Sequence, residues 1–104
     1  MNKDAESKVR RLTPNQAKAL KAIVSSPVGS VVSGIYISTA SGLTGNALGG
    51  TVSALERSGT IQPFGREGRQ FNWELTDSDI VQAKKEDPKT LVKILGQIAG
   101  KVKK

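Results

Sequence analysis

Residues 37–61 read ISTASGLTGNALGGTVSALERSGTI. Apolar residues recur at helical spacing on both sides of a glycine, so the segment predicts a short helix, a tight turn and a second helix. We expect Gly42 to adopt a positive φ in this turn and Leu43 to point into the core. Thr44 can cap the second helix, and Gly59 ends it. The predicted buried side of that helix consists of Ala47, Leu48, Val52 and Leu55.

Two further elements lead into this segment. Thr13-Pro14-Asn15-Gln16 is a helix start, with a threonine cap, a proline at the first helical position and a glutamine that completes a capping box. Residues 28–32 predict a loop followed by a strand of two or three residues. Ser33 can cap a helix over 34–41, whose inner side would hold Ile35, Ile37 or Tyr36, and Ala40.

After residue 60 the apolar pattern changes from helical to alternating. Residues 60–64 and 69–75 predict two strands, joined by a hairpin tip at 65–68. Phe71, Trp73 and Leu75 alternate with polar residues, so we expect them to face the core. The alternative is that Phe71 and Trp73 form a stacking platform for single-stranded bases.

The element order is therefore helix, short strand, helix, helix and hairpin. It predicts an α+β, mainly α fold, a winged helix-turn-helix of three helices plus a β-hairpin wing, with an additional C-terminal helix. The predicted parts are a flexible basic arm at 1–11, the winged-helix domain at 12–75, a polar connector with a helical turn at 76–86, and an amphipathic helix with a basic end at 87–104. The apolar stripe of that last helix can form a homodimer seam or fold back on the first helix of its own chain, and we favour the homodimer.

Composition narrows the classes of function. The net charge is +7, which favours a polyanionic partner because lysine and arginine release counterions condensed on nucleic acid. A soluble basic protein with charged tails is the alternative.

The chain lacks cysteine and histidine, so the usual zinc sites and common nucleophile–base pairs cannot form, and we expect no enzyme, no metal and no cofactor. No apolar run approaches about 18 residues, so we expect no membrane partner and a cytoplasmic, nucleoid-associated location.

The segment 37–44, with Leu48, Val52 and the run 55–61, resembles the helix-turn-helix and wing entry of MarR-like winged-helix regulators. The resemblance starts at the helix opening at 12–17 and covers residues 12–75. It implies that the chain binds double-stranded DNA in transcription regulation, with the helix over 44–58 in the major groove and the hairpin tip on the backbone or minor groove. The DNA-binding residues it implies are Thr44, Gly45, Asn46, Gly49, Gly50, Ser53, Arg57, Arg66 and Arg69.

The chain departs from the family pattern in the helix over 44–58. That helix has no lysine or arginine before Arg57, whereas base-reading helices commonly carry at least one. The adjacent glycines Gly49 and Gly50 each cost about 0.8–1 kcal/mol of helix stability relative to alanine. Either they let DNA approach closely, or they relieve crowding where this helix crosses another. Lys18 and Lys21 on the first helix can likewise bind phosphate or form an ordinary solvated face.

A second function stays open beside DNA binding. Winged helices also serve as protein-interaction modules, and a bare, glycine-rich helix suits packing against a protein. The salt dependence of the binding affinity distinguishes the two hypotheses. Phosphate contacts weaken steeply as the salt concentration rises, whereas apolar docking changes little.

Overall fold

The helix-start signal at Thr13 forms as predicted. In the computed structural model, which describes residues 3–26, 31–67 and 70–100, the Gln16 N–H donates to Thr13 Oγ1 at 3.2 Å. The Thr13 N–H donates in return to Gln16 Oε1 at 2.9 Å, which completes the capping box. Helix α2 (Pro14–Val24) follows, and its Leu20 and Ile23 are fully buried at the centre of the core.

Helices α3 (Gly34–Ser41) and α4 (Gly45–Arg57) meet at the predicted turn. Gly42 has a φ of 78° and donates its N–H to Ser38 O, and Leu43 is buried. Several predictions at the side-chain level were wrong. Ile35 and Ala40 are exposed because the short α3 buries only Ile37 fully, and Ala47 is exposed because the buried side of α4 runs through Thr51 instead. Thr44 occupies the N-cap position without a side-chain cap hydrogen bond.

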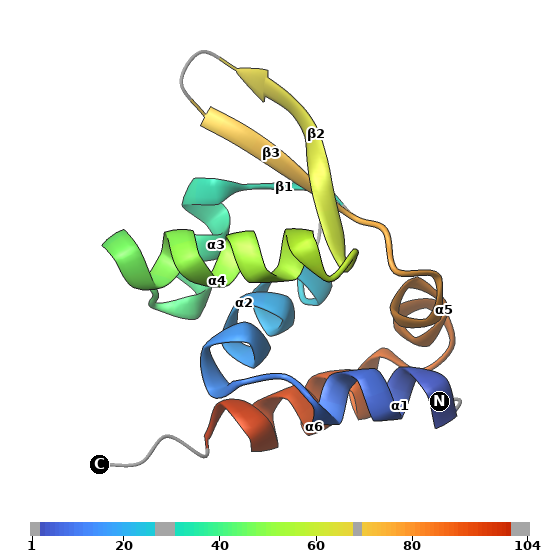
Figure 1. Ribbon diagram of the computed structural model, residues 1–104. Coiled ribbons are helices and arrows are strands. Elements are labelled where there is room, and N and C mark those ends of the chain that lie inside the picture. Colours follow the sequence, from blue (N-terminus) through green and yellow to red (C-terminus); the bar gives the residue numbers. More distant parts are fainter. Residues whose placement is uncertain (1–2, 27–30, 68–69, 101–104) are drawn as a thin grey trace.

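The sheet has three antiparallel strands in the order β1-β3-β2. These are β1 (Val31–Ser33), β2 (Ile61–Glu67) and β3 (Gln70–Leu75). Ile61 pairs with Leu75 at the base of the hairpin, and a bulge interrupts the register between Pro63 and Gly65. Residues 65–67, predicted as the hairpin tip, continue β2, so the hairpin projects beyond the helices (Figure 1).

The prediction of a flexible arm at 1–11 was wrong for residues 3–10. These residues form α1 (Lys3–Arg10), whose Ala5 and Val9 are fully buried. The two side chains lie four residues apart and therefore share one helix face, which packs on the C-terminal helices. A helix of eight residues is not stable alone, so α1 is held by these tertiary contacts.

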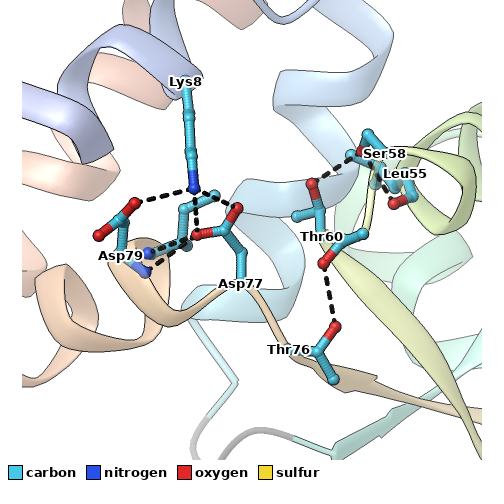
Figure 2. Close-up of polar contacts among 9 residues, drawn as sticks. Lys8, Leu55, Ser58, Thr60, Thr76, Asp77 and Asp79 are labelled. Atoms are coloured by element: carbon cyan, nitrogen blue, oxygen red, sulfur yellow. Dashed lines mark hydrogen bonds and ion pairs between the residues drawn. The ribbon is translucent and has the colours of Figure 1, made fainter.

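The connector predicted at 76–86 also proves to be a helix, α5 (Ser78–Glu86). Asp77 caps it by accepting the N–H groups of Asp79 at 3.0 Å and Ile80 at 3.2 Å. Lys8 of α1 joins this turn, with Nζ 2.8 Å from Asp79 Oδ2 and 3.0 Å from Asp77 Oδ2 (Figure 2). The hydrogen bonds to Asp79 and then Asp77 raise the pKa of Lys8 above its usual value of 10.5.

Helix α6 (Pro88–Ala99) begins at the predicted cap, where the Thr90 N–H donates to Asp87 Oδ1 at 3.3 Å. Its apolar stripe packs on α2, α1 and α5 of the same chain. The buried residues of that stripe are Leu91, Ile94, Leu95 and Ile98, while Val102 lies outside the described residues. This face is covered and does not support the predicted homodimer seam.

Over the described ranges the chain is α+β and mainly helical, and none of its helices is long and apolar enough to cross a membrane.

Candidate nucleic-acid interface

Helix α4 lies against α2 and β2 and presents the opposite side to solvent (Figure 1). Thr51, Val52 and Leu55 are buried, and Leu48 is half-buried. At about 100° per residue the positions predicted to bind DNA fall within about 140° of one another around the helix. All of them are exposed, namely Gly45, Asn46, Gly49, Gly50, Ser53 and Arg57, and the N-cap residue Thr44 is exposed beside them. The structure therefore places these seven predicted residues on one open surface, called here the α4 face.

The two central glycines of α4 stand in open space. A Cβ built on Gly49 or on Gly50 meets no atom within 4 Å. The alternative that these glycines relieve crowding against another helix is therefore wrong for the described chain. Each glycine still weakens the helix by about 1 kcal/mol relative to alanine, and no contact within the described residues compensates for that cost.

The first turn of α4 offers unsatisfied hydrogen-bond donors. Thr44 has extended backbone angles but makes no side-chain cap hydrogen bond. The first intrahelical hydrogen bond of α4 is the one that the Leu48 N–H donates to Thr44 O at 3.3 Å. The preceding amides of the turn point out of the helix end, as helix geometry requires. Such a terminus favours an anion.

The α4 face carries almost no charge of its own. Arg57 lies at its C-terminal end, and the exposed Glu56 lies on the same side one position earlier. Between Gly45 and Leu55 no side chain is ionisable. The face is shaped for close approach, but it does not by itself attract a polyanion.

A network of hydroxyl groups fastens the end of α4 to the hairpin (Figure 2). Ser58 Oγ donates to Leu55 O at 3.0 Å and lies 2.9 Å from Thr60 Oγ1. Thr76 Oγ1 donates to Gly59 O at 3.1 Å, and the Thr76 N–H donates to Thr60 O at 2.9 Å. These bonds join the C-terminus of α4 to the bases of both β2 and β3, which fixes the direction of the hairpin relative to the α4 face.

The structure describes the hairpin arginines only in part. Arg66 belongs to β2 and pairs with Phe71 across the hairpin, whereas Arg69 lies outside the described residues. The DNA contacts predicted for both arginines stay predictions.

Three large apolar side chains, missed by the sequence prediction, lie exposed around the outer part of the sheet. Ile35 is 59% exposed, Phe64 55% and Phe71 49%. Phe71 was predicted to face the core, but only its neighbours are covered, since Trp73 is half-buried and Leu75 is 3% exposed. Phe71 lies 6.3 Å from Trp73 between ring centroids, farther out along β3. Alternation identifies the side of the strand on which a residue lies, but not where the layer beneath that side ends.

Within residues 3–26, 31–67 and 70–100, no three aspartate or glutamate side chains come together as metal ligands would.

The chain matches no protein-family model, no curated protein and no solved structure. What it does must therefore be inferred from its own residues and their geometry.

Proposed function

We propose that this chain binds double-stranded DNA as a MarR-like winged helix, in the role of a transcriptional regulator or small DNA-associated factor. The α4 face enters the major groove, and the β2–β3 hairpin lies on the adjacent backbone or minor groove. The observation that carries the proposal is the pair of glycines at 49 and 50, which face open space on a helix that they weaken.

The glycine pair supports contact with a surface outside the chain. With no neighbour within 4 Å, the missing side chains serve no internal packing. Their effect is to let the backbone of α4 approach an external surface more closely than any other residue type allows. A DNA major groove admits a helix, and the side-chain amide of the exposed Asn46 has the acceptor oxygen and the donor NH2 that make a bidentate contact with adenine.

The architecture supports the same proposal. α3, the Gly42 turn, α4 and the hairpin follow one another in the order of a winged helix-turn-helix, and β1 adds a third strand beside β3. The hydroxyl network at Ser58 and Thr60 holds the hairpin at a fixed angle to α4. A rigid junction of this kind lets one helix and one hairpin contact neighbouring grooves together.

The test is fluorescence anisotropy with a labelled random-sequence duplex across a salt series, for the native chain and for Arg66→Ala combined with Arg69→Ala. We expect an affinity that falls steeply with salt, and a slope of log K against log salt that is smaller by roughly one to two in the double variant. Absence of binding by the native chain at low salt would overturn the proposal.

The exposed apolar residues favour a second candidate function, protein docking. Ile35, Phe64 and Phe71 are each about half exposed or more, and exposed apolar surface can mark a protein interaction site. A protein partner bound through these residues would show little salt dependence, so the same salt series separates the two functions.

A further inference from the structure

The α4 face lacks the positive charge that DNA binding needs. Phosphate neutralisation supplies most of the affinity of a DNA-binding domain, yet the face is uncharged from Gly45 to Leu55. The cations that hold the DNA backbone must therefore come from elements around α4. This inference rests on the proposed function.

A pocket of about 320 Å³ lies between α2, the end of α3 and the end of α6. Lys18, Lys21, Ala22 and Ser25 line it from α2 and its C-cap, at positions that share one helix face. Ala40 and Ser41 close it from α3, and Ala99 closes it from α6. Alanines and serines leave the space open, so the two lysines are the longest groups that reach into it. We call this site the α2 pocket.

The two lysines carry uncompensated charge. Within the described residues neither Lys18 nor Lys21 makes a hydrogen bond or ion pair. The reason lies in the sequence, because no aspartate or glutamate occurs from residue 7 to residue 55, which includes all of α2 and α3 and most of α4. Lys21 extends toward α6, where its Nζ lies 3.6 Å from the position that a Cβ on Gly96 would occupy. Two unpaired ammonium groups beside one cavity create a local positive potential.

The α2 pocket adjoins the start of α4. Ser41 is the last residue of α3, and only the turn at 42–44 separates it from Gly45, the first residue of α4. The end of α3, the start of α4 and the end of α6 lie on the same side of the molecule, at the left of Figure 1. The first turn of α4, which lacks a side-chain cap, is on this side too (Figure 1).

We propose that the α2 pocket binds a phosphate group, and that this group is a backbone phosphate of the duplex when DNA occupies the α4 face. Lys18 and Lys21 supply the positive charge, and the hydroxyl of Ser25 supplies a further donor at the rim. A free phosphate ion has the same chemistry and is the other source of such a group.

The first experiment compares two variants of equal charge in the duplex-binding salt series. Lys18→Gln with Lys21→Gln removes both positive charges from the α2 pocket, and glutamine preserves the helix because its helix propensity is close to that of lysine. Lys85→Gln with Lys89→Gln is the control, because these exposed lysines lie where α5 meets α6, at the opposite end of α6 from Ala99. Thermal unfolding verifies that both variants fold.

We expect the Lys18 and Lys21 variant to lose roughly tenfold in affinity at about 0.1 M salt and to show a slope smaller by about one, as removal of one phosphate contact predicts. The control should keep the native slope. Equal losses in both variants would overturn the proposal, because they would reflect net charge alone.

The second experiment titrates inorganic phosphate into the ¹⁵N-labelled native chain and follows amide shifts. Shifts confined to residues 18–25, 40–41 and 96–99 that vanish in the Lys18 and Lys21 variant support the pocket. If these shifts occur while the native chain binds no duplex, the pocket holds a free phosphate and the proposed DNA function fails by itself. If neither phosphate nor duplex is affected by the variant, the pocket proposal is wrong.

Discussion

Gly49 and Gly50 are the residues at which stability and function should conflict. Both lie mid-helix with no neighbour for an added Cβ, so Gly49→Ala and Gly50→Ala should each raise the free energy of unfolding by about 0.5–1 kcal/mol. The added methyl groups also keep the backbone of α4 away from a groove. We expect the double variant to be more stable in urea unfolding and yet to bind duplex DNA several-fold more weakly.

The control for this prediction changes helix stability in the other direction. Gln82 is exposed on α5, outside the α4 face. Gln82→Gly should lower stability by about 0.5–1 kcal/mol and leave the duplex affinity of the folded protein unchanged. If the alanine variants bind as tightly as the native chain, the glycines have no role in binding.

At the scale of elements, α1 belongs to the folded core. Val9 is fully buried, so Val9→Ala should lower the free energy of unfolding by about 2 kcal/mol through lost burial and the cavity left behind. Ser7→Ala on the exposed side of α1 should change it by less than about 0.5 kcal/mol. Equal behaviour of the two variants in urea unfolding would mean that residues 3–10 act as a flexible arm after all.

The cap of α6 should contribute to the acid sensitivity of the fold. Hydrogen bonds from the side chain and N–H of Thr90 lower the pKa of Asp87 below its usual value of 3.8. The carboxylate thus stabilises the folded state above pH 3.8, and this contribution is lost as the pH falls through the lowered pKa.

Asp87→Asn keeps a good helix cap but removes this titration. The native chain should therefore lose more stability than the variant between about pH 7 and about pH 2.5, measured by urea unfolding at both values. Ser7→Ala, an exposed change that removes no ionisable group, is the control and should show the same loss as the native chain. Parallel losses in the native chain and Asp87→Asn would contradict the assigned cap.

Three of the predicted helices begin at caps that the sequence marks locally. The cap pairs Thr13 with Gln16, Ser33 with Tyr36 and Asp87 with Thr90 lie three residues apart, and all three form. α1 could not be found in this way, because only Ala5 and Val9 mark its buried side and their contacts come from distant parts of the chain. Helical periodicity predicted that α4 has a buried side, and the residues of the α4 face came from the resemblance to winged-helix regulators. The α2 pocket depends on the packing of three helices, which no local pattern reveals.

For the whole molecule, the covered stripe of α6 leads to a prediction about assembly. Leu91, Leu95 and Ile98 are already buried against α2, α1 and α5, so this face is not available to a second chain. We expect sedimentation velocity at micromolar concentration to give the mass of a single chain. A dimer under these conditions would contradict the placement of α6 on its own chain.

The bulge in β2 has a consequence for solubility. β2 is an edge strand, and a regular edge beside the exposed Phe64 would offer a row of free backbone groups to which another strand could add. Pro63 has no N–H to donate, and the register shift between Pro63 and Gly65 breaks the regular spacing that strand addition needs. The bulge and Pro63 thus protect the hairpin against edge-to-edge aggregation. Replacing Pro63 and removing the bulge would leave β2 as a regular edge to which a strand of another chain could add.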